Sequence, residues 1–324
     1  MTDTNRPEDE GRSAAERAGI VDQQDAALEA MDDAPEAAGA APSGRPGGEH
    51  GGNGDGKGGL AVVTGASSGI GLALSRQFAD HGFDVMVVAE DEGVERAAAE
   101  VRARGVVPVA VRADLATPAG VEELFAGIEG TGRPVEALAV NAGVGVSGRF
   151  VETDLDAHLG LIGLNVTGAV HLSRLVLPGM VSRGRGRVLF TSSMAAAMPG
   201  PYESTYAASK AFVYSFAQAI RRELKGTGVT VTALLPGPTD TNFFARAGME
   251  DTKLGQSRKD DPDDVARDGF EALMAGKDHV VAGSNRNKAQ VVAARVLPDA
   301  VAASMHGALS KPGSGRSVSP SAGG

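Results

Sequence analysis

The stretch Leu60–Gly71, LAVVTGASSGIG, decides the fold of this chain. Its first five residues (60–64) are mostly apolar and rich in valine, which is typical of a buried strand. Apolar residues at helical spacing follow the glycines. Gly65, Gly69 and Gly71 allow a tight turn and a close approach of the backbone to a ligand. Because the next helix begins with unpaired N–H groups and the positive end of its dipole, the turn predicts a pyrophosphate site. An ordinary glycine-rich turn is the alternative.

Six further apolar runs alternate with helical patterns. They predict strands at 84–89, 106–111, 135–140, 187–191, 229–235 and 279–283. Helices are predicted at 69–81, 94–104, 119–129, 154–176, 206–225 and 263–275, with the fourth ending before Pro178. Because these strands are apolar on both faces, they suit a parallel sheet that helices cover on both sides. We therefore predict an α/β fold, a single doubly wound Rossmann domain with a seven-stranded parallel sheet.

The two ends of the chain differ from this pattern in composition. Residues 1–58 carry thirteen Asp and Glu against five Lys and Arg and have no aromatic residue. Such a segment cannot bury enough apolar surface to offset its ordering entropy, so we predict a disordered extension. The folded domain is expected over 59–285, a C-terminal helical segment over 286–306, and a disordered Ser-, Gly- and Pro-rich tail over 307–324.

Composition limits the location and the partners of the protein. The 324 residues include no cysteine, which excludes disulfides and thiolate metal sites, and the acidic N-terminus lacks the basic start and apolar core of a signal peptide. We therefore expect a cytoplasmic protein. No run approaches about 18 uninterrupted apolar residues, so no membrane-spanning helix is predicted. The net charge of −10 argues against nucleic acid. No metal site is predicted, because the helical histidines His81, His158 and His171 stand singly.

An acidic pair ends the second predicted strand, about twenty residues beyond the glycine turn. Glu90 and Asp91 stand where a carboxylate accepts hydrogen bonds from the adenosine ribose hydroxyls and repels a 2′-phosphate. This placement predicts NAD in preference to NADP. The alternative is that the two acids only begin the next helix.

A tyrosine and a lysine share one face of the fifth predicted helix. Tyr206 and Lys210 are four residues apart, whereas Tyr202 and Tyr214 have no lysine at that spacing. A unit charge about 4 Å away at an effective dielectric near 20 is worth about 4 kcal/mol and favours the phenolate. We therefore expect Lys210 to lower the pKa of Tyr206 toward the working range of a general acid or base. A solvated helix pair is the alternative.

Together these motifs resemble the short-chain dehydrogenase/reductase family over roughly residues 59–285. The matching elements are TGASSGIG (64–71), Glu90, Asp114-Leu115, NAG (141–143), Asn165, Ser193, YAASK (206–210) and PGPTDT (236–241). The resemblance implies hydride transfer between a nicotinamide cofactor and a small-molecule secondary alcohol or ketone. A catalytically silent dinucleotide-binding protein, used for sensing or for interactions, is the alternative from another class.

The resemblance also implies a role for each matching residue. Ser193 would orient and polarise the substrate oxygen, Tyr206 would move its proton, and Lys210 would lower the tyrosine pKa and hold the nicotinamide ribose. Asn165 would maintain a water relay to Lys210. The cofactor would lie against Gly65, Ser67, Ser68, Gly69, Ile70, Gly71, Glu90, Asp114, Leu115, Asn141, Ala142, Gly143, Tyr206, Lys210, Pro236, Gly237, Thr239 and Thr241. Similar members often place Arg after the second strand to bind NADP, whereas this chain has Glu90 there.

The fourth and fifth predicted helices carry apolar residues beyond those that face the sheet. These residues are Leu159, Ile162, Val166, Val170, Phe212, Phe216 and Ala219. A monomer would leave part of this surface in water. In the family that the motifs resemble, these two helices commonly pair with their copies, so a homodimer or homotetramer is expected. The identity of the substrate is not readable from the pocket-forming segments 144–152, 194–202 and 239–258.

Overall fold

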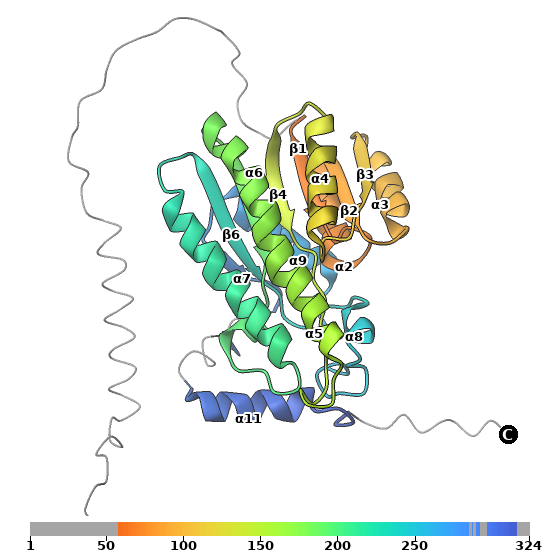
Figure 1. Cartoon of the computed structure of the whole chain (residues 1–324), viewed down its shortest axis with the longest axis vertical. Helices are drawn as coiled ribbons and strands as arrows, with labels where there is room; N and C mark the ends of the chain where they lie inside the picture. The colour runs from red at the N-terminus through yellow and green to blue at the C-terminus, as the bar shows by residue number, and fades with distance from the viewer. Residues whose placement is uncertain (1–57, 285–286, 288–289, 292–296, 316–324) are drawn as a thin grey trace, which may run out of the picture. The chain divides into compact units, whose positions relative to one another are not determined.

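The seven predicted apolar runs form one parallel sheet in the order β3-β2-β1-β4-β5-β6-β7 (Figure 1). The computed structural model describes residues 58–284, 287, 290–291 and 297–315. The strands are β1 (Leu60–Thr64), β2 (Asp84–Ala89), β3 (Pro108–Arg112), β4 (Val135–Val140), β5 (Gly186–Thr191), β6 (Val229–Leu235) and β7 (His279–Val281). This order, which grows outward from β1 in both directions, confirms the predicted doubly wound Rossmann sheet.

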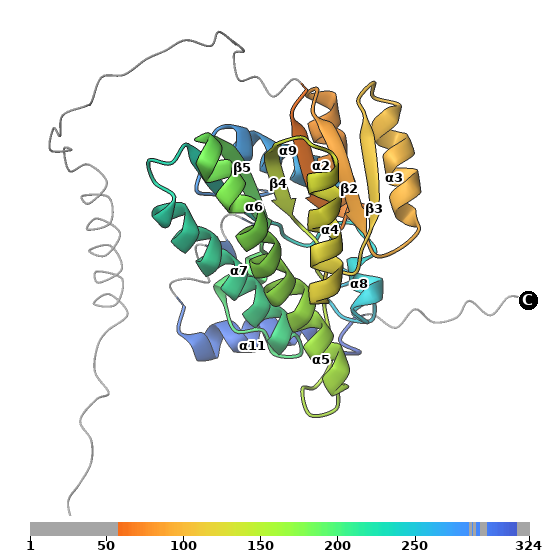
Figure 2. The ribbon, with the colours of Figure 1, turned by 45° about the horizontal axis from the view of Figure 1, so that its top comes forward.

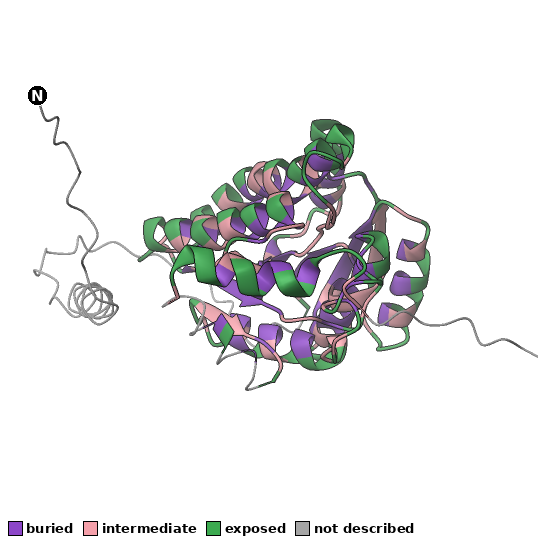
Figure 3. Cartoon of the chain, turned by 90° about the horizontal axis from the view of Figure 1, so that it is seen from below, coloured by how far each residue is buried: buried purple, intermediate pink, exposed green. Residues whose placement is uncertain are grey.

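Helices cover both faces of the sheet (Figures 1 and 2). One layer consists of α4 (Pro118–Gly130), α5 (Leu155–Ile162), η1 (Gly163–Gly168), α6 (Ala169–Arg183) and α7 (Ser204–Glu223). The other consists of α2 (Gly69–Asp80), α3 (Gly93–Arg102) and α9 (Pro262–Met274). The helices bury the side that faces the strands and expose the other (Figure 3), so the apolar core forms two large clusters separated by the sheet. A third, small cluster consists of Phe244, Ala247 and Met249.

The helical run from α5 to α6 departs from the prediction in two ways. It continues through Pro178 to Arg183, so the expected end before Pro178 is wrong; Gly184, whose φ is +69°, ends it instead. Its middle, η1, is a π-helix, a wider turn that often occurs at functional sites. By length and composition Leu155–Arg183 could also span a membrane, but it packs against α4, α7 and β4. The core helices of soluble proteins can have the same length and apolar composition.

The C-terminal region extends the ordered part of the chain beyond its predicted limit. Helix α11 (Asp299–Ser310) crosses the predicted boundary at 306, and the backbone N–H of Gly315 donates to the Asp251 carbonyl at 2.8 Å. The prediction of disorder is therefore wrong for 307–315, because hydrogen bonds to distant segments hold these residues. The predicted extension, apart from Gly58, and residues 316–324 lie outside the described residues.

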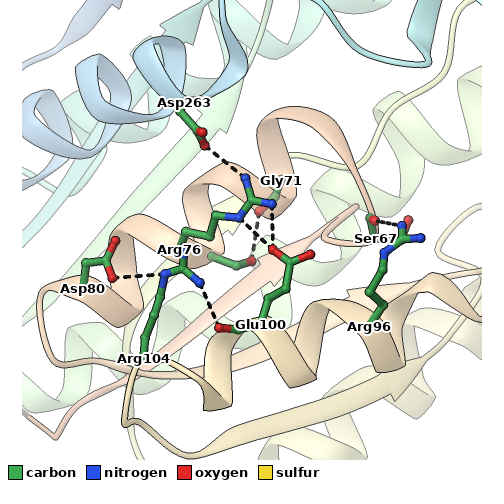
Figure 4. Close-up of polar contacts among 9 residues, drawn as sticks. Ser67, Gly71, Arg76, Asp80, Arg96, Glu100, Arg104 and Asp263 are labelled. Carbon is green, nitrogen blue, oxygen red and sulfur yellow. Dashed lines mark hydrogen bonds and ion pairs between the residues drawn. The ribbon is translucent and has the colours of Figure 1, made fainter.

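Helix α2, which follows the glycine turn, is fixed from both sides. Its Arg76 donates to Glu100 of α3 at 2.6 Å and to Asp263 of α9 at 3.2 Å (Figure 4). Beneath these partly exposed ion pairs, the Phe78 ring packs edge-on against Phe83 and Phe270, with centroids 5.4 and 5.2 Å away. Exposed ion pairs contribute about 0–1 kcal/mol, so the aromatic contacts dominate the stability of this layer.

We expect Phe78→Ala to lower the free energy of unfolding by about 3–5 kcal/mol, because it leaves a cavity under α2 where the native ring is 0% exposed. The measurement is urea denaturation followed by circular dichroism. Phe150→Ala is the matched control; its ring is 62% exposed, so the change should stay within about 0.5 kcal/mol. Equal losses in the two variants would contradict this view of the core.

Candidate active site

The carboxyl ends of β1, β4 and β5 are tied together by side-chain hydrogen bonds. Thr64 Oγ1 accepts from the backbone N–H groups of Asn141 and Ala142 at 2.9 and 3.0 Å. The Asn141 amide donates to the Thr64 carbonyl and accepts from Thr191 Oγ1, each at 3.0 Å. Lys210 of α7 then donates from Nζ to the Thr191 carbonyl at 2.9 Å. The predicted NAG turn therefore lies between the glycine turn and the Tyr-Lys helix.

The glycine turn leaves the start of α2 open to the pocket. Gly65 has a φ of +66°, and a Cβ on Gly71 would lie 2.1 Å from the Gly65 carbonyl oxygen, so neither position accepts a larger residue without movement. Ser68 precedes α2 in an extended conformation without a side-chain cap, and the first turn holds no acid. Uncapped N–H groups at a helix N-terminus suit a phosphate, so this turn fits the pyrophosphate of a dinucleotide.

Tyr206 and Lys210 are buried side by side on α7. Lys210 Nζ lies 5.9 Å from the centre of the Tyr206 ring. Burial raises the pKa of Tyr206; a hydrogen bond with the Ser193 side chain opposes this rise, and the negative charge of Glu203 adds to it. Burial lowers the pKa of Lys210 to about 8. The expected fall in the tyrosine pKa is therefore not found, because desolvation of the phenolate exceeds any gain from the ammonium, which bonds to Thr191.

Asn165 lies in the π-helix η1 and fixes the loop after β4. Its side chain accepts from the Val144 N–H at 2.9 Å and donates to the Val144 carbonyl and to Ser209 Oγ, each at 3.0 Å. These bonds hold Asn165 beside α7. A Cβ added to Gly143 would lie 3.1 Å from both Asn165 Oδ1 and Lys210 Nζ, so both side chains pack closely against this glycine.

The acidic pair after β2 meets two different partners. Asp91 accepts from Ser67 Oγ of the glycine turn at 2.9 Å and from the Gly93 N–H at 2.8 Å. Glu90 forms an ion pair with Arg246 of α8 (Phe243–Arg246), and both residues line the pocket. Neither acid therefore serves only to begin α3. The partner of Glu90 is 156 positions away in sequence, and no motif around Arg246 signals the contact.

One cavity of about 660 Å³ unites these elements at the carboxyl edge of the sheet. Most of the predicted site lines it: Gly65, Ser67, Ser68, Gly69, Ile70, Gly71, Glu90, Leu115, Asn141, Ala142, Gly143, Ser193, Tyr206, Lys210, Pro236, Gly237, Thr239 and Thr241. Two predicted residues do not line it. Asn165 is buried behind the wall. Asp114 is exposed and accepts from the Ala116 N–H at 2.9 Å, in the turn that leads into α4.

The cavity also contains residues that the motifs do not mark. Apolar residues also line it: Met194, Met198, Phe243, Phe244, Leu254, Leu297, Ala302, Met305 and Leu309. Glu203 and His306 add two polar groups there. Their sequence signal is weak, because a methionine or phenylalanine at helical spacing is more often part of the core. Only the folded chain brings the C-terminal helix to this wall.

Comparison with known proteins agrees with the geometry. Residues 59–251 match the model of the short chain dehydrogenase family. The chain is 40% identical over 185 residues to 1-deoxy-11-beta-hydroxypentalenate dehydrogenase from Streptomyces exfoliatus, covering 56% of this chain and 67% of that protein. Among solved structures, it resembles a short-chain dehydrogenase from Sphingobium yanoikuyae in complex with NADPH, with a TM-score of 0.65, 31% identity and coverage of 69% and 87% of the two chains.

A short-chain dehydrogenase/reductase from Burkholderia phymatum in complex with NAD is also similar, with a TM-score of 0.67 and 26% identity; the match covers 74% of this chain and 93% of that one. The family match covers more than half of the chain, and the glycine turn and the Tyr206–Lys210 pair line one cavity. The chain therefore belongs to the short-chain dehydrogenase family of oxidoreductases.

Proposed function

We propose that the chain is a cytoplasmic oxidoreductase that moves a hydride between a nicotinamide dinucleotide and a secondary alcohol or ketone. One observation carries the proposal: a buried Tyr206, with Ser193 and Lys210 beside it, shares a cavity with the uncapped start of α2. The absence of cysteine in the given sequence supports the location.

The proposed mechanism divides the work between two parts of the cavity. The start of α2 would hold the pyrophosphate and Lys210 would hold the ribose next to the nicotinamide, and the dinucleotide would supply or accept the hydride. The hydroxyls of Ser193 and Tyr206 hold the substrate oxygen. During reduction, Tyr206 donates its proton to the carbonyl oxygen as negative charge develops there; oxidation reverses this transfer. Burial raises the pKa of Tyr206, which keeps its proton in place at neutral pH but makes it a weaker acid, so the transfer depends on the negative charge that develops on the carbonyl oxygen.

Tyr206→Phe removes the proposed proton donor without removing the ring. We expect turnover to fall by about 10²–10⁴-fold, whereas the Kd of the coenzyme stays within a few-fold. Turnover is followed by the absorbance of the reduced nicotinamide across a panel of ketones and alcohols, and coenzyme binding by calorimetry. Tyr214→Phe, on the same helix but outside the cavity, is the control. Coenzyme binding without turnover of any substrate by the native chain would favour the silent binding protein instead.

NAD is the proposed coenzyme. The argument rests on Glu90, which lines the cavity at the end of β2 and would repel a 2′-phosphate. Arg246 moderates this repulsion, because its guanidinium pairs with the Glu90 carboxylate. A 2′-phosphate would compete with Glu90 for Arg246, so we expect a preference for NAD that is smaller than an unpaired acid would give.

Glu90→Arg should move the preference toward NADP. The replacement puts two guanidinium groups where a 2′-phosphate would lie, so the ratio of the Kd of NADP to the Kd of NAD should fall at least tenfold. Glu92→Arg is the matched control, because Glu92 is also acidic but lies outside the cavity. Tighter binding of NADP than of NAD by the native chain would refute the proposed preference.

We also propose that the protein associates through α5, α6 and α7. On these helices Leu159, Ile162 and Phe212 are exposed, as the prediction requires. Val166, Val170 and Phe216 are partly buried next to them. A two-fold contact needs only one self-complementary patch, and pairing would cover this apolar surface. A homodimer or a homotetramer is the proposed assembly.

Leu159→Glu combined with Phe212→Glu should break this association, because it places four like charges in a two-fold contact. The native chain of 32.8 kDa should give a mass two or four times larger by light scattering, and the double variant a monomer. Val107→Glu, also an exposed apolar position but next to β3, is the control that should leave the mass unchanged. A monomeric native chain at micromolar concentration would exclude the interface.

A further inference from the structure

A buried carboxylate joins the C-terminal helix to the helix that carries Tyr206. Glu203, immediately before α7, is only 3% exposed. Its Oε2 atom forms a hydrogen bond with His306 Nε2 at 2.8 Å and accepts another from Ser310 Oγ at 2.5 Å. Both partners belong to α11. Burying a carboxylate is costly unless hydrogen bonds compensate it. The three residues, here called the α11 latch, are therefore a specific attachment and not an incidental surface contact.

The packing around the latch holds α11 close to the chain on two sides. A Cβ added to Gly307 would lie 3.2 Å from the Pro201 side chain, so this glycine permits the close approach to the loop before α7. On the other side, the backbone N–H of Leu254 donates to the Leu309 carbonyl at 3.0 Å. Figures 1 and 2 show α11 lying across the end of the molecule at which α5 and α7 begin.

Helix α11 gives the cavity an apolar wall. Ala302, Met305 and Leu309 of this helix line the same cavity as the site residues Ser193 and Tyr206. The side chains of Met305 and Leu309 both line the cavity, yet they are 58% and 39% exposed to solvent. A carbon-rich ligand would remove this surface from water, which is favourable by about 0.8 kcal/mol for each buried CH₂ group.

We propose that Glu203 is a positioning residue that, through the α11 latch, fixes α11 as the wall selecting bulky, apolar ketones and alcohols. This inference rests on the proposed function for the reaction. The attachment itself does not: it follows from the two hydrogen bonds and the close packing of Gly307. Glu203 stands three residues before Tyr206, so the latch fixes the substrate wall relative to the proton donor.

Hydrogen–deuterium exchange tests the attachment without any substrate. In Glu203→Gln the charge-assisted bonds are lost, and in Ser310→Ala one donor is lost, so amide exchange over 302–310 should rise at least tenfold in the first and by less in the second. Glu223→Gln on α7 and Ser304→Ala on α11 are matched controls at exposed positions, with native exchange expected. Exchange in α9 should stay unchanged in all four variants. Native exchange over 302–310 in both latch variants would overturn the proposal.

A pair of ketones tests the specificity. The probes are the bicyclic ketone 2-decalone and the smaller cyclohexanone, both reduced by the full-length chain with its preferred coenzyme. The native ratio of kcat/KM for the bicyclic ketone to that for cyclohexanone should exceed one. Glu203→Gln should lower this ratio at least tenfold, mainly because the bicyclic ketone binds with a higher KM. The Kd of the coenzyme should not change, because the latch lies on the substrate side.

The ratio separates positioning from general damage, because a merely structural defect lowers both rates together. A looser α11 with an unchanged ratio would overturn the role in specificity. If the native chain reduces neither ketone, the proposed preference for apolar ketones fails, whereas the exchange measurement still decides the attachment. If Glu203→Gln does not fold by circular dichroism, Ser310→Ala, which keeps the carboxylate, decides both measurements.

Discussion

The site depends on one series of hydrogen bonds, partly or fully buried, that runs across the carboxyl edge of the sheet. It links Thr64 of β1 to Asn141 after β4, Asn141 to Thr191 of β5, and the Thr191 carbonyl to Lys210 of α7. Each member satisfies a polar group that would be costly to bury alone. Strands that meet only through their backbones could slide, but these side chains fix their ends. The glycine turn, the NAG turn and the tyrosine helix consequently keep one mutual geometry.

Burial has opposite effects on the pKa of Lys210, which ends this series of hydrogen bonds, and on the pKa of Tyr206 beside it. It disfavours the phenolate of Tyr206 and the ammonium of Lys210, so the pKa of the first rises and that of the second falls to about 8. Both groups are therefore held closer to their neutral forms than they would be in water. A surface pair with the same spacing would lack this property, since solvent would stabilise the charged form of each group.

Local patterns predicted most of the fold, because strands and helices leave a periodic signal that nearby residues carry. The sequence signals of the glycine turn and of the Tyr206–Lys210 pair are equally local, and the residues of both motifs line the cavity. Contacts between distant segments were not predictable: the pairing of Glu90 with Arg246 and the α11 latch join residues more than 100 positions apart. The pKa of Tyr206 was predicted with the wrong sign, since spacing reports the nearby charge but not the depth of burial.

The π-helix η1 has a consequence for how the sequence can change in length. An extra residue within a helical turn rotates everything before it by about 100° relative to everything after it. Leu159, which precedes this segment, is exposed, and Asn165, which lies within it, accepts a hydrogen bond from the Val144 N–H. Deleting one residue from Gly163–Gly168 would restore an ordinary turn and bring the two faces out of phase. We therefore expect insertions and deletions among homologues to be tolerated in surface loops and rejected in this segment.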